Sequence, residues 1–150
     1  MEKLNVNELI KQVSGEFEDK FKAHNLQEII TLPEKEVYVK ADSRYMYRVL
    51  ENMYSNISKY AMEGTRVYVD IAEKNNKVSI QLKNVSNQKL NISADELMQR
   101  FVRGEASRNT EGSGLGLSIA RSLTELQKGQ FNIYLDGDLF KVTIEFEKEL

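Results

Sequence analysis

Four short segments alternate apolar and polar residues, and this alternation constrains the fold more than any other feature of the sequence. The alternating segments are residues 67–71, 78–82, 131–135 and 140–146. Polar, turn-forming residues at 74–77 and 136–138 separate the two members of each pair. Successive side chains of a β-strand point to opposite faces of a sheet, so each segment has one apolar face. The sequence therefore predicts two β-hairpins, each with one face that must be covered.

Three longer segments have the helical spacing of apolar residues. They cover residues 5–23, residues 43–61 after an N-cap at Asp42 or Ser43, and residues 115–128 before Gly129, the expected C-terminal cap. The residues expected to face inward are Leu9, Val13, Phe17 and Phe21 in the first helix, Met46, Val49, Leu50, Met53, Ile57 and Ala61 in the second, and Ile119, Ala120, Leu123 and Leu126 in the third.

A short strand at 36–41 and a short helix at 94–101 complete the predicted elements, and Gly64 is expected to stop the second helix. About three helices and about five strands, all apolar on one side only, predict a two-layer α/β sandwich of the α+β class. A length of 150 residues suits one domain over residues 1–150.

The charge balance gives no sign of a polyanionic partner. The chain has 21 Lys and Arg against 23 Asp and Glu, a formal net charge of −2, so nucleic acid and anionic membranes are not expected partners. It has no cysteine and one histidine, which excludes Cys-ligated zinc and any multi-histidine metal site. No apolar run approaches the ~20 residues that span a bilayer, and the N-terminus lacks the apolar core of a signal peptide. We expect a cytoplasmic location.

The most distinctive local signal is a glycine-rich segment where a loop meets the third helix. Its residues are Gly112, Ser113, Gly114, Leu115, Gly116 and Leu117. A helix N-terminus offers unpaired N–H groups and a partial positive charge to a phosphate, and glycine lets the backbone approach an anion closely. The segment matches neither a Walker loop nor the strand-first dinucleotide fingerprint. A flexible loop entering a helix has the same composition, so this segment alone leaves both interpretations open.

Polar residues on the second helix give another signal. Asn52, Asn56 and Lys59 share one helical face, which borders the apolar stripe. Asn oxygens can help to ligate Mg²⁺, and a nearby Lys can meet phosphate charge. Arg100, Arg103 and Arg108 lie around the start of the loop, where arginine also suits phosphate. Each group, taken alone, also fits an ordinary solvated surface.

The order of these features resembles the ATP-binding catalytic domain of bacterial sensor histidine kinases. That family belongs to the superfamily of gyrase-type, Hsp90-type and MutL-type ATPases. Residues 51–61 resemble its N box, residues 101–103 its F box, and residues 111–117 its second glycine box. The resemblance covers essentially the whole chain and implies the Bergerat ATP-binding fold, with ATP and Mg²⁺ as ligands.

The resemblance also implies roles for individual residues. Asn56 would ligate Mg²⁺, with Asn52 as a phosphate contact or second metal contact. Lys59 and Arg103 would approach the phosphates, while Tyr60 would lie against the nucleotide. Further implied contacts are Phe101 of the F box, the backbone of Leu115 and Leu117, Ser113, and the glycines at 112, 114 and 116. Residues 103–114 would form a lid over ATP.

The chain departs from the family where the adenine should bind. The family's first glycine box, Asp-x-Gly-x-Gly, supplies an Asp that accepts a hydrogen bond from the adenine amino group. Here residues 83–90 read Lys-Asn-Val-Ser-Asn-Gln-Lys-Leu, with neither Asp nor Gly. Asn84 falls about where that Asp is expected and still offers a carbonyl acceptor, although a neutral one. Ser86 is the next candidate. We expect a variant adenine site with an affinity for ATP in the micromolar range or weaker.

The chain also lacks the dimeric helical hairpin whose histidine accepts the phosphoryl group in this family. His24 has neither the acidic neighbour nor the proline typical of that acceptor, and is expected to be a surface residue. The resemblance therefore implies an isolated, monomeric catalytic domain without membrane contacts. Its partners would be the phosphoacceptor domain of the same kinase and a response regulator.

Two other functions fit the same fold. One is a serine kinase or ATPase of the anti-sigma-factor type, although such kinases usually keep the first glycine box. The other is a degenerate nucleotide-binding scaffold, which the missing Asp would favour. The intact N box, F-box arginine and second glycine box favour catalysis, so phosphoryl transfer from Mg·ATP to a histidine is the expected function.

Overall fold

The fold consists of one mixed sheet with helices on one of its faces. The computed structural model describes residues 1–88 and 115–149. The helix predicted at 94–101 and the lid predicted at 103–114 lie outside these residues. In the described part, the helices are α1 (Val6–Ala23), α2 (Ser43–Tyr60) and α4 (Leu115–Leu126). The strands are β1 (Glu2–Asn5), β2 (Gln27–Thr31), β3 (Tyr38–Ala41), β4 (Arg66–Lys74), β5 (Lys77–Val85), β6 (Gln130–Asp136) and β7 (Leu139–Glu147).

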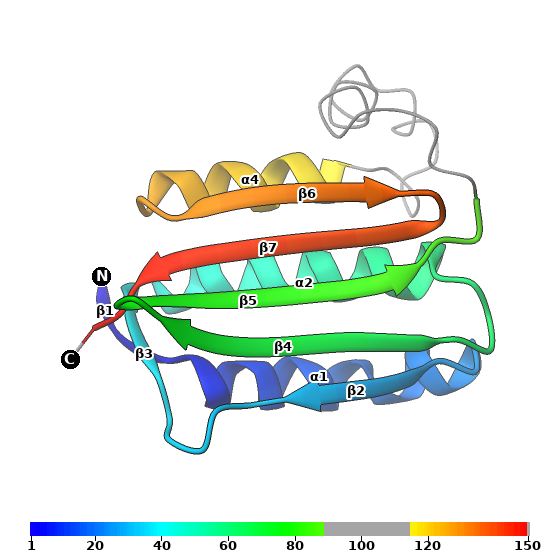
Figure 1. Ribbon diagram of the computed structural model, residues 1–150, viewed down its shortest axis with the longest axis horizontal. Coiled ribbons are helices and arrows are strands. Elements are labelled where there is room, and N and C mark those ends of the chain that lie inside the picture. The colour runs from blue at the N-terminus through cyan, green and yellow to red at the C-terminus, as the bar shows by residue number, and fades with distance from the viewer. Residues whose placement is uncertain (89–114, 150) are drawn as a thin grey trace.

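The main sheet has the strand order β2-β4-β5-β7-β6. β2 runs parallel to β4, and the remaining neighbours are antiparallel, so the sheet is mixed. β1 and β3 pair separately as a two-stranded antiparallel sheet. The three described helices all lie on the same face of the main sheet, and residues 1–88 and 115–149 leave the other face open (Figure 1). The predicted two-layer α/β sandwich is confirmed.

The two predicted hairpins form β4–β5 and β6–β7. Asn75 and Asn76 both have positive φ, 54° and 65°, as a two-residue type I′ turn requires. In the second hairpin Asp136 pairs with Leu139, and Gly137 has a φ of 60° in the tight turn between them. Both turns suit the right-handed twist of the paired strands, and their geometry fixes the register of each hairpin.

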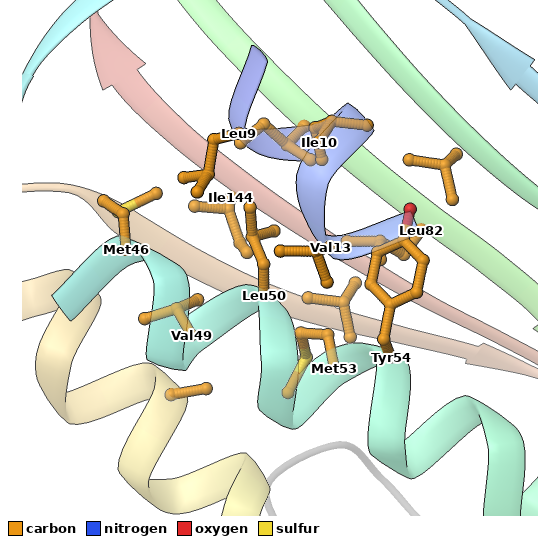
Figure 2. Packing of buried hydrophobic residues seen from close by; sticks show 14 of the residues in the cluster. Leu9, Ile10, Val13, Met46, Val49, Leu50, Met53, Tyr54, Leu82 and Ile144 are labelled. Carbon is orange, nitrogen blue, oxygen red and sulfur yellow. The ribbon is translucent and has the colours of Figure 1, made fainter. Parts of the chain in front are cut away.

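The core lies between the helices and the sheet. Every residue predicted to face inward on α1 and α2 is buried. Figure 2 shows Leu9, Ile10 and Val13 of α1 beside Leu50 and Met53 of α2. Each buried aliphatic side chain contributes ~1.5–3 kcal/mol, so these stripes hold α1 and α2 against the sheet.

One predicted strand is placed differently. The strand predicted at 36–41 begins at Tyr38 and belongs to the small sheet, not to the main one. The fifth strand of the main sheet is β2, Gln27–Thr31, which the pattern did not reveal. β2 is an edge strand whose residues are half-buried or exposed, so it lacks the alternation that marks a one-sided strand.

The predicted inward face of α4 is partly wrong. Leu126 is 68% exposed, whereas Leu117, Ala120, Thr124 and Gln127 are buried. Thr124 and Gln127 can be buried because each donates a side-chain hydrogen bond to the backbone carbonyl four residues earlier. Thr124 Oγ1 donates to the carbonyl of Ala120 at 2.8 Å, and Gln127 Nε2 donates to the carbonyl of Leu123 at 2.9 Å.

The end of α4 also differs from the prediction. The helix stops at Leu126, and Lys128, with a φ of 67°, takes the left-handed position expected of Gly129. Gly129 N–H donates to the carbonyl of Thr124 at 3.0 Å, as in a Schellman motif. A Cβ at Gly129 would lie 2.6 Å from the Phe146 ring, so close packing is what requires glycine here.

No helix in the described ranges combines the length and the apolar character needed to cross a membrane.

Candidate functional site

Three elements that carry predicted site residues meet at one end of the molecule. In Figure 1 the C-terminal end of α2, the end of β5 and the start of α4 lie toward the same side of the molecule. Met62 N–H donates to the carbonyl of Val85 at 2.8 Å, and Asn87 N–H donates to the carbonyl of Tyr60 at 2.8 Å. These hydrogen bonds fix the end of α2 to the end of β5.

The glycine segment reaches the same place through α4. The side-chain nitrogen of Asn52 donates a hydrogen bond of 3.3 Å to the carbonyl of Gly116, in the first turn of α4. A Cβ at Gly116 would lie 3.7 Å from Cβ and Cγ of Asn52, so the two backbones are close without a clash. The unpaired N–H groups of a first helical turn attract anions, and here that turn lies beside the Asn-bearing helix.

The other predicted residues of α2 follow in the next turns. Asn56 is half-buried, one turn beyond Asn52, and Lys59 is exposed. Tyr60 is half-buried at the last position of the helix, and this burial raises the pKa of its phenol. An amide, an ammonium and an aromatic ring thus follow Asn52 along α2 toward the end of β5.

Asn84 is the most unusual polar residue of the site. It continues the buried face of β5 formed by Val78, Ile80 and Leu82, and it is only 4% exposed. Its Oδ1 atom is buried and has no hydrogen-bond partner among the described residues. A buried acceptor without a partner costs ~1–3 kcal/mol. The end of β5 therefore holds an acceptor that is suited to a donor from outside.

Ser86 has a local role in the structure. It is buried, its Oγ accepts a hydrogen bond of 3.1 Å from Gln88 N–H, and its own N–H donates to the carbonyl of Asp138 at 2.7 Å. These bonds hold the end of β5 against the β6–β7 turn. Ser86 thus supports the strand end that carries Asn84.

The remaining predicted residues are described only in part or not at all. Leu117 is 1% exposed within the core, so only its backbone faces the site. Leu115 is the first residue of α4. Phe101, Arg103, Gly112, Ser113 and Gly114 lie outside the described residues. Within residues 1–88 and 115–149, no group of three or more His, Asp or Glu side chains could hold a metal ion.

A hydrogen-bonded cluster behind the site escaped the sequence analysis. Tyr54, fully buried in α2, donates from its hydroxyl to Glu28 Oε2 at 2.6 Å. Ser14 Oγ of α1 donates to Glu28 Oε1 at 2.5 Å, and the rings of Tyr54 and Phe21 stack with centroids 5.7 Å apart. The cluster fixes the rotation of α2 about its axis. The sequence offered one signal for this cluster, which is that Tyr54 lies on the inward face of the second helix and its buried hydroxyl needs a partner. That partner, Glu28, belongs to strand β2, which was not predicted.

The chain resembles proteins of one family along most of its length. Residues 41–149 match the family of histidine kinase-, DNA gyrase B- and HSP90-like ATPases. The chain is 32% identical over 115 residues to the probable sensor protein PcoS of Escherichia coli, covering 74% of this chain and 25% of PcoS. It is 27% identical over 135 residues to the sensor histidine kinase WalK of Bacillus subtilis, covering 85% of this chain and 22% of WalK. The chain thus spans a quarter or less of these two relatives.

Solved structures of similar fold agree with this family match. The nucleotide-free catalytic domain of histidine kinase ThkA superposes with a TM-score of 0.82 at 25% identity, covering 99% of this chain and 97% of that domain. The structure of ThkA in complex with the response regulator protein TrrA has a TM-score of 0.77 at 22% identity, covering 99% of this chain and 42% of ThkA. This second match shows the fold alone.

Proposed function

Because the chain belongs to the family of histidine kinase-, DNA gyrase B- and HSP90-like ATPases, we propose that it binds Mg·ATP for transfer of the γ-phosphoryl group to a histidine. That histidine belongs to a separate domain of a longer two-component sensor kinase. The observation that carries the proposal is the hydrogen bond from Asn52 to Gly116, which joins the N-box helix to the helix that follows the glycine segment. A phosphate group at that junction would contact the side chains of Asn52 and Asn56 and the N–H groups in the first turn of α4.

The phosphate end of the site uses amides, cations and backbone N–H groups. Asn56 ligates Mg²⁺ through its side-chain oxygen, with Asn52 beside it. The bound ion supplies neutralisation of the phosphate charge. Lys59 and Arg103 add positive charge, and the glycine segment supplies N–H donors to the phosphate oxygens. Phosphoryl transfer needs positioning and charge stabilisation more than covalent chemistry from the protein, and these groups suit that task.

The adenine end depends on Asn84. Its buried, unpartnered Oδ1 is a suitable acceptor for the adenine amino group. An apolar strand face surrounds it, which strengthens a hydrogen bond by excluding water. Tyr60, the last residue of α2, would lie against the nucleotide. The neutral amide makes this bond weaker than one to a carboxylate, in keeping with an affinity in the micromolar range or weaker.

The acceptor histidine and the general base belong to other parts of the kinase. The downstream partner is a response regulator, a proposal supported by the fold shared with ThkA in its complex with TrrA. We place the domain on the cytoplasmic side of a sensor kinase and expect it to be monomeric when isolated. A test for phosphoserine on a partner protein separates this function from that of a serine kinase.

Calorimetry of the chain with Mg·ATP tests the proposal, using Asn56→Ala and Ser55→Ala as a matched pair. Ser55 is the half-buried neighbour of Asn56, and its backbone carbonyl accepts a hydrogen bond of 2.8 Å from Ser58 Oγ, which an alanine at position 55 would keep. We expect wild type and Ser55→Ala to bind alike, and Asn56→Ala to lose most of its magnesium-dependent affinity. Equal affinity of both variants contradicts the metal assignment. Absence of binding by wild type at millimolar Mg·ATP contradicts the proposed nucleotide site, whereas binding without autokinase activity in the full-length kinase favours the scaffold function.

A further inference from the structure

The open face of the main sheet carries a row of two tyrosines and two lysines across four strands. Tyr68 of β4 pairs with Lys83 of β5, Lys83 pairs with Lys141 of β7, and Lys141 pairs with Tyr134 of β6. Their neighbours along each strand face the core, so these four side chains point away from the helices. Figure 1 shows this face of the four strands uncovered by the described helices. We call this set the Tyr–Lys row.

Each lysine is held by a tyrosine ring. Lys83 Nζ lies 5.2 Å from the ring centroid of Tyr68, and Lys141 Nζ lies 4.8 Å from that of Tyr134. Such cation–π contacts restrict the long side chains, so a ligand that binds the ammonium groups loses less conformational entropy. Tyr134 is 51% exposed, which is unusual for a large aromatic side chain.

The two lysines lie directly opposite each other on adjacent strands. Side chains in this relation have Cβ atoms about 4.5–5.5 Å apart, and like charges there destabilise a sheet. None of the described carboxylates forms an ion pair with Lys83 or Lys141. On the same face, the adjacent row on one side carries one carboxylate, Asp70, paired with Gln81, and the adjacent row on the other side carries one, Asp136, paired with Leu139. The Tyr–Lys row is therefore a local concentration of positive charge, and a bound anion would relieve its repulsion.

We propose that the Tyr–Lys row binds a carboxylate-rich segment of a partner protein. In an extended segment, side chains two residues apart lie about 7 Å from each other, within reach of both ammonium groups. The tyrosine rings then pack against the intervening apolar atoms. A nucleic acid suits the surface less well, because the whole chain has a net charge of −2 and a long polyanion meets repulsion outside the row. This site is separate from the proposed nucleotide site, since Lys83 and Asn84 point to opposite faces of β5.

Fluorescence anisotropy with a labelled peptide of alternating Glu and Ser residues tests this proposal. We expect saturable binding at low ionic strength, and about tenfold weaker binding by Lys83→Gln/Lys141→Gln, since two exposed charge contacts are lost. The matched control is Lys3→Gln/Lys40→Gln, because this exposed pair is also directly opposed, in the β1–β3 sheet. The control should bind as wild type does, and saturating Mg·ATP should not displace the peptide.

Several results would overturn the proposal. These are no saturable binding, equal loss in both double variants, displacement by Mg·ATP, or tighter binding of a single-stranded oligonucleotide than of the peptide. A second measurement needs no variant. In nuclear magnetic resonance titrations of wild type, the peptide should shift the amide signals of the Tyr–Lys row more than those of α1. Shifts confined to other surfaces would contradict the assignment.

Discussion

The side-chain amide of Asn52 donates a hydrogen bond of 3.3 Å to the backbone carbonyl of Gly116, 64 residues further along the chain. This bond joins the helix that carries Asn56 to the first turn of α4. Because the side-chain nitrogen of Asn52 donates to Gly116, its side-chain oxygen is left as an acceptor that could coordinate a cation. The bond brings together two segments whose signals were each ambiguous in the sequence, and this supports the proposed phosphate site.

Gly116→Ala should weaken ATP binding without lowering the stability of the fold. A Cβ at this position would meet Asn52 at 3.7 Å, which is an ordinary contact, and alanine is favoured over glycine in a helix by up to ~1 kcal/mol. We expect an unchanged or higher melting temperature, together with about tenfold weaker ATP binding, because the methyl group hinders the approach of phosphate to the backbone. Calorimetry and thermal unfolding measure the two effects. Unchanged ATP affinity would show that phosphate does not approach Gly116.

Gly129→Ala should behave in the opposite way. Its Cβ would lie 2.6–3.0 Å from three atoms of the Phe146 ring, far from the site at the other end of α4. We expect a loss of about 1–3 kcal/mol in the free energy of unfolding, because the ring must shift within a close-packed core. ATP affinity, measured well below the melting temperature, should not change. Wild-type stability of this variant would show that the ring moves without cost.

Asn84→Leu should raise the stability of the nucleotide-free chain and abolish nucleotide binding. Removing the unpartnered Oδ1 from an apolar surrounding should raise the free energy of unfolding without nucleotide by about 1 kcal/mol. The same change removes the proposed adenine acceptor, so Mg·ATP should no longer raise the melting temperature. A lower stability would indicate that Asn84 has a partner in the folded chain.

Asn84→Asp should have the reverse effect. A carboxylate buried at a position that is only 4% exposed lacks a compensating charge, so the nucleotide-free variant should be less stable at neutral pH. A charge-assisted bond to adenine is stronger than a neutral one, so ATP should bind several-fold more tightly than to wild type. Thermal shift with and without Mg·ATP measures both. Weaker ATP binding would contradict the adenine assignment.

Tyr54 should make the stability depend on pH in the alkaline range. Burial, then the charge of Glu28, raises the pKa of its phenol far above the ordinary value of about 10. The phenol stays protonated in the folded chain where it ionises in the unfolded chain. Its contribution is therefore complete below pH ~10 and is lost as the pH rises above that value, by about 1.4 kcal/mol per pH unit.

Tyr54→Phe should reduce the slope of urea unfolding stability against pH above pH ~10, while Tyr47 and Tyr60, whose pKa values are also raised, keep the remainder. It should also lower stability at neutral pH by about 1–3 kcal/mol, because Glu28 loses a donor. Tyr45→Phe is the control, since Tyr45 is 39% exposed. An identical alkaline slope in Tyr54→Phe and wild type would contradict the role given to the buried phenol.

His24 should not become phosphorylated in this chain. It forms the C-cap of α1, and its Nδ1 lies 3.5 Å from Glu63 Oε1. It therefore lies at the end of a helix that packs on the main sheet, and not on a separate helical hairpin. Incubation with γ-labelled ATP and Mg²⁺ should leave the chain without phosphohistidine, and acid-labile label on His24 would refute this.

Most helices and strands could be predicted from the sequence, because each is marked by a periodic pattern of apolar residues within its own segment. The stripes of α1 and α2 and the alternation of β4, β5, β6 and β7 each reflect one face buried against the other layer. β2 escaped prediction because an edge strand that is half-buried on both sides has no such period. The exposed Leu126 and the buried Thr124 show the same limit, since helix hydrogen bonds allow a polar residue in the stripe.

The sequence indicated which elements carry the candidate site residues, but it did not indicate their contacts. The spacing of Asn52 and Asn56, and the place of Asn84 after an alternating strand, were visible in the chain. The bond from Asn52 to Gly116 and the bond from Tyr54 to Glu28 join segments far apart in sequence. Whether the described residues supply a donor to Asn84 Oδ1 is likewise decided by long-range packing. Such partners depend on how β2, α1 and α4 pack around α2, which no local pattern specifies.

A crystal structure of the chain with Mg²⁺ and a non-hydrolysable ATP analogue tests the central claim most directly. We predict that the adenine amino group lies within hydrogen-bond distance of Asn84 Oδ1. The phosphates should lie between Asn56 and the first turn of α4. A nucleotide bound elsewhere, or an adenine that leaves Asn84 Oδ1 without a partner, would contradict the account.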